Sequence, residues 1–260
     1  MSQQQQPQPR RTVVVTGGGK GIGEAVVRAL AADGYDVTYT FRASADAARA
    51  LTDDLAGRHP GQTFAGIETD LADAGQVELL AAKLEAMPQL YGLIHNAGAT
   101  ADALAALLDQ ARAQMLMQVN FLAMTRLIKA ALRPMLRARA GRIIGIGSIT
   151  ATRGAQGNAA YAASKGAMAS FMRTLAVEVG ARGVTANIIA PGYVDTQMLA
   201  PYAGVRGTVE RQIPVGRYVR PEEVAALVAF LAGPLAAAIT GAEIRIDGGL
   251  SAAIAIGRGK

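Results

Sequence analysis

The stretch TVVVTGGGKGIG, from Thr12 to Gly23, decides the fold of this chain. Its first five residues form an apolar run typical of a strand buried on both faces, and helical sequence continues to Ala32. The glycines between these elements allow a sharp turn and a close approach of the backbone to a ligand. The amino end of a helix carries partial positive charge and favours a pyrophosphate here. The stretch therefore predicts a dinucleotide-binding loop, with contacts expected from Gly17, Gly19, Lys20, Gly21, Ile22 and Gly23.

Outward from this loop, short β-rich runs alternate with longer Ala-rich helical stretches. We predict strands at residues 12–16, 36–41, 63–68, 92–95, 142–147, 185–190 and 243–246. Helices are expected at 23–32, 77–86, 113–138, 161–180 and 221–232, among others. The pattern predicts a single Rossmann-type α/β domain over residues 12–260: a doubly wound parallel sheet of about seven strands, with helices on both faces. Residues 1–11 are rich in Gln and Pro, and we expect them to form a disordered tail.

Composition excludes several classes of function. The chain has no Cys, which excludes disulfides and thiolate catalysis, and its two His are too few for a typical zinc site, so no metal is predicted. The net charge of +6 is spread along the chain without a nucleic-acid reader motif, so no nucleic-acid partner is expected, although an acidic partner or a phosphorylated ligand stays open. No apolar run reaches the roughly 18–20 residues that span a bilayer, and no signal peptide is recognised. We expect no membrane association and a cytoplasmic location.

The end of the second predicted strand indicates which nicotinamide cofactor binds. An NADH enzyme usually offers a carboxylate there, whereas this strand ends in Arg42. The nearest acid, Asp36, begins the strand roughly 15 Å away at about 3.3 Å per residue. Arg42 can form a fork onto a 2′-phosphate, and Lys20 can reach the same group, so NADPH is favoured. The alternative is a solvated arginine that opens a helix.

Asp70 and Leu71 follow the third predicted strand and are further candidates for cofactor contacts. The Asp70 carboxylate could accept a hydrogen bond from the adenine amino group. It could equally be the N-cap of the following helix, and the sequence leaves both roles open.

Polar residues that follow the later strands indicate a catalytic site, because ligands of such sheets bind beyond the carboxyl ends of the strands. Tyr161 and Lys165 are four residues apart and share one face of a helix. A neighbouring ammonium favours the phenolate and should lower the pKa of the tyrosine. Ser148, at a strand end, can hold a substrate carbonyl oxygen. The other residues that follow strands are Asn96, Ala97, Gly98, Pro191, Gly192, Val194 and Thr196.

With these motifs, the chain resembles the short-chain dehydrogenase/reductase family from about residue 11 to its end; Asp247-Gly248-Gly249 also matches. The resemblance implies that Tyr161 is the general acid, that Ser148 orients the carbonyl, and that Lys165 holds the nicotinamide ribose and depresses the pKa of the tyrosine. It implies that Asn120 anchors a water that relays protons to Lys165. Pro191, Gly192, Val194 and Thr196 match the segment that holds the nicotinamide carboxamide, and Asn96, Ala97 and Gly98 match a further cofactor-binding turn. The implied assembly is a homotetramer.

Two residues depart from the pattern of the family. His95 stands where relatives often have a second Asn before Asn96-Ala97-Gly98, and we interpret it as a packing or hydrogen-bonding substitute in the turn. Met117 lies in a region where relatives often carry Trp. Neither change removes a residue of the implied catalytic set.

Within the family, the chain is most similar to 3-oxoacyl-[acyl-carrier-protein] reductases, through the segments 96–104 and 192–198. Arg139 and Arg182 match arginines that dock acyl carrier protein, although both could simply be cations favoured at helix C-termini. Residues 197–217 are expected to form a mobile lid whose large side chains suit an acyl chain: Met198, Leu199, Tyr202 and Ile213. The implied function is NADPH-dependent reduction of a 3-oxoacyl thioester in fatty-acid or polyketide-type synthesis.

Two other functions stay open. The chain could be a ketoreductase that acts on acetoacetyl-CoA or another small ketone. It could also be a non-catalytic NADP-binding regulator, but that function predicts losses among Ser148, Tyr161 and Lys165, and the sequence retains all three.

Overall fold

The computed structural model describes residues 10–253, and in these the seven strands of one parallel sheet are arranged in the order β3-β2-β1-β4-β5-β6-β7. The strands are β1 (Thr12–Thr16), β2 (Asp36–Phe41), β3 (Phe64–Glu68), β4 (Leu90–His95), β5 (Gly141–Ile146), β6 (Val184–Pro191) and β7 (Glu243–Ile246). From β1 the chain winds outward first through β2 and β3 and then through β4 to β7. This confirms the predicted doubly wound sheet, and its switch point lies between β1 and β4.

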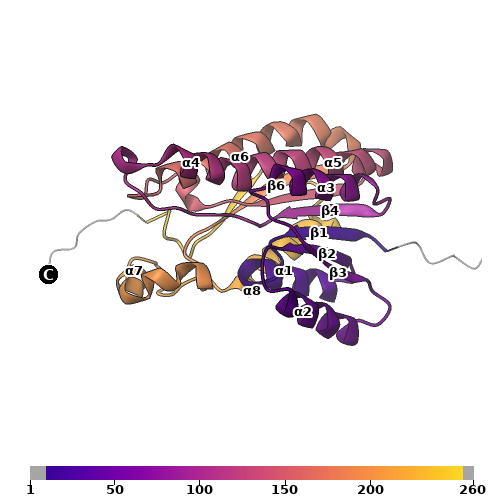
Figure 1. Ribbon diagram of the computed structural model, residues 1–260, viewed down its shortest axis with the longest axis horizontal. Coiled ribbons are helices and arrows are strands. Elements are labelled where there is room, and N and C mark those ends of the chain that lie inside the picture. Colours follow the sequence, from indigo (N-terminus) through magenta and orange to yellow (C-terminus); the bar gives the residue numbers. More distant parts are fainter. Residues whose placement is uncertain (1–9, 254–260) are drawn as a thin grey trace, which may run out of the picture.

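Two layers of helices cover the sheet (Figure 1). The apolar side chains of α1, α2 and α8 pack on one face, and those of α3, α5 and α6 pack on the other. The helices are α1 (Gly21–Ala32), α2 (Ala45–Arg58), α3 (Ala74–Glu85), α4 (Gln110–Met117), α5 (Ala123–Ala138), α6 (Ala159–Val179), α7 (Arg206–Glu210) and α8 (Pro221–Ala232). Both faces of the central strands are therefore buried, which explains why their sequences are continuously apolar.

The predicted strand bounds agree with the structure within two residues, and the predicted helix bounds within three. Helix α2 was not among the helices named from the sequence. The predicted tail at residues 1–11 lies outside the described residues except for its end. That end is ordered: the Arg11 carbonyl accepts a hydrogen bond from Asp36 N, and the Arg11 guanidinium lies 4.2 Å from the centre of the Tyr91 ring.

Helices α4 and α5 belong to one helical stretch, Gln110–Ala138, which a π-helical turn at Gln118–Leu122 interrupts. Within residues 10–253 this is the one helix that is long and apolar enough to cross a membrane, but half of its apolar window is buried. Met124, Leu127 and Met135 are fully buried in the core beneath it. The stretch is accordingly a core helix of the fold.

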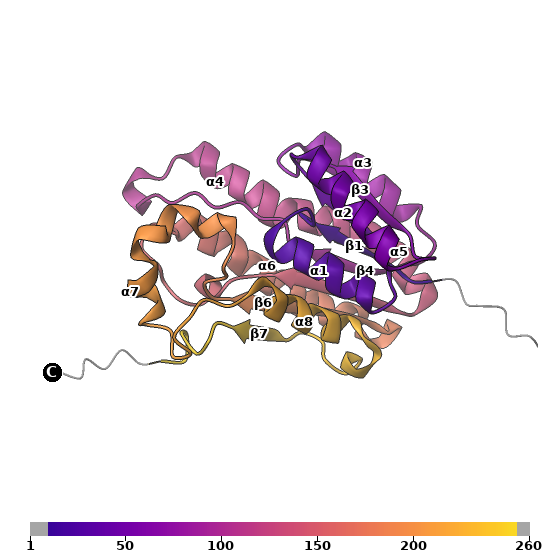
Figure 2. The same cartoon turned by 90° about the horizontal axis from the view of Figure 1, so that it is seen from below.

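The carboxyl ends of the strands open toward the side of the molecule where α7 and the start of α4 lie (Figures 1 and 2). Figure 2 also shows α1 beside α8 on one face of the sheet. The residues that follow β1, β4, β5 and β6 therefore meet at a single edge of the sheet.

Candidate active site

The loop after β1 has a backbone conformation and close contacts that only glycine allows. Gly17 has a φ of +65°, a conformation that other residues adopt at a cost. A Cβ at Gly23 would collide with the carbonyl oxygen of Gly17, so the first turn of α1 lies directly against the loop. The amides of Gly17 and Gly18 are bound by Thr40, at 3.0 Å to its hydroxyl and 2.8 Å to its carbonyl. The free N–H groups at the start of α1 are thus next to a fixed backbone turn, which suits a pyrophosphate.

Asn96 and Ala97 join the end of β4 to this loop. The Asn96 amide group donates to the carbonyls of Thr16 and Gly17, at 3.1 and 3.0 Å. The backbone amides of Asn96 and Ala97 both donate to Thr16 Oγ1 at 3.1 Å. A Cβ at Gly98 would lie 3.4 Å from Lys165 Nζ, so the turn also approaches α6. The structure therefore brings Asn96, Ala97 and Gly98 next to the nucleotide loop, and their contact with the cofactor stays a prediction.

Lys20 immediately precedes α1, and Arg42 immediately follows β2. A Cβ at Gly19 would be 3.2 Å from Phe41 Cβ, so the residues next to these two cations are in direct contact. Both side chains are exposed, and within residues 10–253 neither makes a side-chain hydrogen bond or an ion pair. Two cations whose neighbouring residues touch, and which have no side-chain partner in the part of the chain that the structure describes, fit a phosphate group.

One alternative for Asp70 is wrong. The N-cap of α3 is Asp73, whose carboxylate accepts from the amides of Gly75 and Gln76 at 2.8 and 3.2 Å. Asp70 lies too early in the turn for that role and accepts from Ala72 N at 3.0 Å. Leu71 is buried beside it. A contact between Asp70 and the adenine therefore stays a prediction.

Ser148, Tyr161 and Lys165 lie together at the carboxyl end of β5. Lys165 and Tyr161 come from the start of α6, and Lys165 Nζ lies 5.7 Å from the centre of the Tyr161 ring. The ammonium donates to the carbonyl oxygen of Ile146 at 2.8 Å. The Ser148 hydroxyl is close enough to hydrogen-bond the phenol of Tyr161. A hydroxyl donor, a phenol and an ammonium thus share one site.

The expected effect of Lys165 on Tyr161 is not found. Burial raises the pKa of the Tyr161 phenol above its usual value, and the hydrogen bond with Ser148 opposes this only in part. The reason is geometric: the ammonium is bound to Ile146 O and lies over the ring instead of at the hydroxyl. Burial also lowers the pKa of Lys165 to about 8. At neutral pH the phenol is therefore protonated, as a proton donor must be.

Thr150 is a residue that the sequence analysis missed. Its amide and its hydroxyl both donate to Ser148 Oγ, at 3.2 and 2.8 Å. With its oxygen occupied in this way, the Ser148 hydroxyl is left to donate its own proton to a further acceptor. The signal was present in the sequence as a hydroxyl residue two positions after Ser148, a spacing typical of serine and threonine turns.

Asn120 lies in the π-helical turn, a type of distortion often found at functional sites. Its side chain is fully buried, and both of its polar atoms are hydrogen-bonded. Oδ1 accepts from Ala99 N at 2.8 Å, and Nδ2 donates to Ala99 O at 3.0 Å and to Ser164 Oγ at 2.8 Å. Asn120 therefore ties the turn after β4 to α6, one residue before Lys165.

The chain is similar to known proteins over nearly its whole length. Residues 17–251 match the family model described as Enoyl-(Acyl carrier protein) reductase. The 3-oxoacyl-[acyl-carrier-protein] reductase FabG of Escherichia coli strain K12 is 36% identical over 242 residues, which cover 92% of this chain and 97% of the relative. The chain belongs to the short-chain dehydrogenase/reductase family. It is an oxidoreductase of that family and uses a nicotinamide cofactor.

Solved structures of short-chain dehydrogenase/reductases agree with this assignment. A member from Serratia marcescens BCRC 10948 has a TM-score of 0.86 at 35% identity and covers 95% of this chain and 100% of its own. A putative NAD(P)-dependent gluconate 5-dehydrogenase from Beutenbergia cavernae, with NADP bound at low occupancy, has a TM-score of 0.88 at 34% identity. It covers 94% of this chain and 97% of its own.

The segment after β6 begins the wall of the site in this short-chain dehydrogenase/reductase. Pro191 ends β6, and a Cβ at Gly192 would lie 2.8 Å from Asp247 Cβ, so the chain passes close to the C-terminal turn. Thr196 Cγ2 is 3.4 Å from the Cβ position of Gly21, next to the nucleotide loop. Val194 is buried and forms a parallel bridge with Val219.

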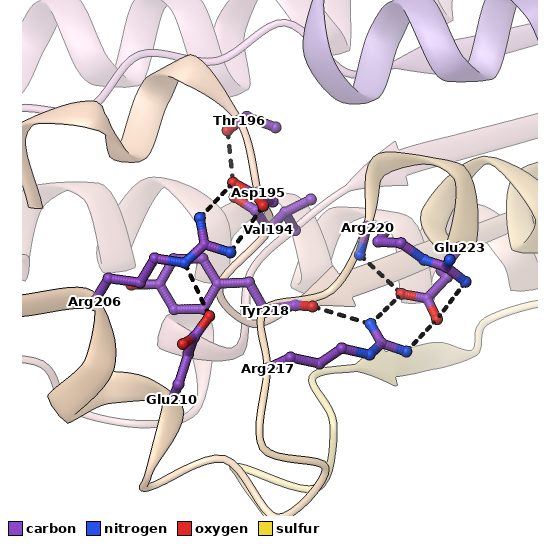
Figure 3. Close-up of polar contacts among 9 residues, drawn as sticks. All are labelled: Val194, Asp195, Thr196, Arg206, Glu210, Arg217, Tyr218, Arg220 and Glu223. Carbon is purple, nitrogen blue, oxygen red and sulfur yellow. Dashed lines mark hydrogen bonds and ion pairs between the residues drawn. The ribbon is translucent and has the colours of Figure 1, made fainter. Parts of the chain in front are cut away.

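Residues 197–217, the lid, lie between these two bridged residues and are held by ion pairs (Figure 3). Arg206 donates to both carboxylate oxygens of Asp195, at 2.9 and 2.8 Å, and to Glu210 at 2.9 Å. Its guanidinium lies 4.6 Å from the centre of the Tyr218 ring. Arg206 thus joins the lid to the segment that contains Thr196.

Three of the four large lid residues predicted to suit an acyl chain remain available for that role. Met198 and Tyr202 are 52% and 39% exposed, and Leu199 and Tyr202 line a cavity of about 210 Å³ beside Thr196. Ile213 is buried against the turn at Gly248, so its assignment to a substrate wall is wrong. A larger cavity of about 490 Å³ between β3 and α3 contains none of the predicted site residues.

Arg139 and Arg182 lie at the amino ends of β5 and β6, at the edge of the sheet opposite to Ser148 and Tyr161. Both side chains are exposed. Arg139 donates to the carbonyl of Ala181, the residue before Arg182, at 3.2 Å, and Arg182 donates to the carbonyl of Leu136 in α5 at 3.5 Å. They are therefore neighbours, and the strands separate them from the catalytic residues by roughly 20 Å.

Proposed function

We propose that this chain reduces the 3-oxo group of an acyl thioester borne by acyl carrier protein, with NADPH as the hydride donor. The observation that carries the proposal is the group of Ser148, Tyr161 and Lys165 beside the glycine-rich loop. A non-catalytic regulator has no need for a buried ammonium and a protonated phenol at one site. The similarity to 3-oxoacyl-[acyl-carrier-protein] reductases over nearly the whole chain supports the same substrate class.

In the proposed mechanism, Ser148 donates a hydrogen bond to the substrate carbonyl oxygen, because Thr150 occupies the acceptor sites of its hydroxyl. NADPH held at the glycine-rich loop would supply the hydride for the carbonyl carbon. Tyr161 gives its phenolic proton to the oxygen, which becomes the hydroxyl of the product. A water anchored at Asn120 returns a proton to the phenolate through Lys165, whose ammonium lies over the ring.

Lys20 and Arg42 support NADPH over NADH. Both are exposed cations without partners within residues 10–253, and they flank the contact of Gly19 with Phe41. A 2′-phosphate carries the charge that such a pair binds best. Gly17, Gly21, Ile22, Gly23, Asp70, Leu71, Asn96, Ala97 and Gly98 are proposed to complete the cofactor site, with Pro191, Gly192, Val194 and Thr196 at the nicotinamide.

The lid supports an acyl substrate, because Leu199 and Tyr202 offer apolar surface beside Thr196. We propose that Arg139 and Arg182 attract the acidic carrier protein. We also propose a homotetramer in the cytoplasm. Exposed apolar side chains on α6, on α8 and after it are available for its contacts: Val177, Phe230 and Leu235.

The test compares two substrates in one charge-reversed variant. We expect Arg139→Glu with Arg182→Glu to raise KM for an acetoacetyl-carrier-protein thioester about 10-fold or more at low salt, since encounter with an acidic partner is steered by charge. KM for the N-acetylcysteamine thioester, which lacks the protein, should not change. The effect on the carrier-protein substrate should shrink as salt screens the charges.

The matched control is Arg49→Glu with Arg58→Glu, the same charge change on the exposed side of α2. It should leave both substrates unaffected. If the reversed variant keeps the wild-type KM for the carrier-protein thioester, docking at Arg139 and Arg182 is rejected. Equal activity of the wild type on acetoacetyl-CoA would then favour the ketoreductase alternative.

A further inference from the structure

His95, the last residue of β4, is where this chain departs from the Asn common in its family. The side chain is 2% exposed, and its two ring nitrogens have different surroundings. Nδ1 lies 3.2 Å from Thr16 Oγ1 in the nucleotide loop. Nε2 is buried without a hydrogen-bond partner of good geometry. Buried polar atoms of this kind are rare and ask for an explanation.

The contacts of Thr16 determine which ring nitrogen carries the proton. Thr16 Oγ1 already accepts two hydrogen bonds, from the amides of Asn96 and Ala97. Its own proton must therefore be donated elsewhere, and Nδ1 of His95 is the acceptor within reach. A neutral imidazole that accepts at Nδ1 carries its proton at Nε2.

The ring is neutral throughout the physiological range. Burial, and then the ammonium of Lys165, lower the pKa of His95 to about 3. The Nε2–H tautomer is therefore a permanent feature of the site.

The backbone of Val119 and Asn120 lies close enough to the ring to raise the pKa of His95 slightly, against the larger effect of burial. Because Nδ1 is taken by Thr16, Nε2–H is the group left to meet their carbonyls, although it has no well-formed hydrogen bond. Both carbonyls belong to the π-helical turn at Gln118–Leu122, whose wider winding shifts its carbonyls out of the α-helical ladder. The same turn carries Asn120, whose Oδ1 lies 3.4 Å from the Cβ position of Gly98, as does Lys165 Nζ. A small shift of this turn would bring the donor and a carbonyl into bonding geometry.

We propose that His95 is a positioning residue that links Thr16 of the nucleotide loop to the π-helical turn of Asn120. Through Nδ1 it holds the loop that binds the cofactor. Through Nε2–H it holds the turn that carries the proton relay to Lys165. This inference rests on the proposed reductase function, and it adds a residue that the family pattern does not supply.

Two substitutions test the contacts of the two ring nitrogens separately. His95→Asn places an amide oxygen near the Nδ1 position, so it retains the bond from Thr16 but does not reach the turn. We expect it to lower kcat about 10-fold, since misplacement of a catalytic group by about 1 Å has effects of this size or larger. The basic limb of its kcat–pH profile should shift, while Kd for NADPH stays within about twofold of wild type.

His95→Gln should have the reverse effect on the two contacts. Its longer side chain brings an N–H near the Nε2 position but loses the hydrogen bond with Thr16. We expect kcat and its pH profile close to those of wild type and a Kd for NADPH raised about 5–10-fold, the worth of one neutral hydrogen bond. Hydrogen exchange supplies a readout independent of activity. The amides of residues 118–124 should exchange faster in His95→Asn than in His95→Gln.

The proposal is overturned if His95→Asn keeps the wild-type kcat, pH profile and exchange rates. It is also overturned if both variants change kcat and Kd together in proportion to a lower melting temperature, which a merely structural role predicts. A wild-type protein that reduces no ketone with NADPH would reject the proposed function instead, and hydrogen exchange would still decide the contact of His95 with the turn.

Discussion

Tyr161 is the residue on which the proposed chemistry depends most. Because burial raises the pKa of its phenol, the group is a proton donor at neutral pH. Tyr161→Phe removes only the hydroxyl, so we expect NADPH binding to persist while kcat falls by roughly 10²–10⁴, the usual contribution of a general acid. Stopped-flow turnover and cofactor fluorescence measure the two effects.

Tyr202→Phe is the control, since this tyrosine lies in the lid and is partly exposed. It should retain turnover within a few-fold of wild type. Turnover near the wild-type rate in Tyr161→Phe would assign the proton to another group.

Arg42 is the residue that we expect to select the cofactor. Arg42→Ala removes a charge-assisted contact worth about 1.5–3 kcal/mol, which corresponds to a loss in NADPH affinity on the order of 10–100-fold. NADH affinity should hardly change, because NADH lacks the 2′-phosphate. Titration of both cofactors into wild type, Arg42→Ala and the control Arg49→Ala measures this, and equal losses for NADPH and NADH would mean that Arg42 acts on the loop instead.

At the scale of elements, the lid is held to the cofactor segment by Arg206 (Figure 3). The rings of Tyr193 and Tyr218 stack, with centres 5.5 Å apart, beside the bridge of Val194 with Val219, so the base of the lid is fixed. Arg206 links the middle of the lid to Asp195. Its ion pairs are partly exposed to solvent, so each adds little to the stability of the fold. Arg206→Gln should therefore loosen the lid without unfolding the protein.

We expect Arg206→Gln to raise KM for the acyl thioester about fivefold, with little change in kcat at saturation. With the N-acetylcysteamine thioester, which does not depend on carrier-protein docking, raising the salt concentration should weaken substrate binding by wild type and leave the variant unaffected. The matched control is Arg211→Gln, an exposed lid arginine whose side chain bonds only Thr208 among the described residues. An unchanged KM in Arg206→Gln would show that the lid closes without this contact.

At the scale of the whole molecule, His95 makes the stability of the fold depend on pH. Its pKa is about 3 in the folded chain and 6.5 when exposed, so between these values the unfolded chain binds a proton that the folded chain excludes. Stability is therefore lost as pH falls below 6.5, by about 1.4 kcal/mol per pH unit.

Urea unfolding of wild type and His95→Gln at pH 7, 6 and 5, at one protein concentration, measures this slope. The contributions of all other groups cancel in the difference between the two proteins. As pH falls, we expect the free energy of unfolding of wild type to decrease relative to that of His95→Gln. Parallel curves would mean that His95 is exposed to protons in the folded state.

Local patterns determined much of this protein. The run of valines before the glycines predicts a buried strand and a nucleotide loop, because burial on both faces and a turn at glycine depend on neighbouring residues alone. The four-residue spacing of Tyr161 and Lys165 likewise places them on one helical face without knowledge of the rest. The alternation of β and α runs predicts the doubly wound sheet for the same reason.

Only the tertiary structure decided how these residues affect one another. The strand order brings Thr16 beside Asn96, and the π-helical turn brings Asn120 to Ala99 and Ser164. The expected depression of the Tyr161 pKa was wrong, because the packing of α6 on β5 gives Lys165 a carbonyl partner and buries the phenol. Burial and hydrogen bonds between distant segments set the protonation of Tyr161, Lys165 and His95, and no local pattern in a sequence carries them.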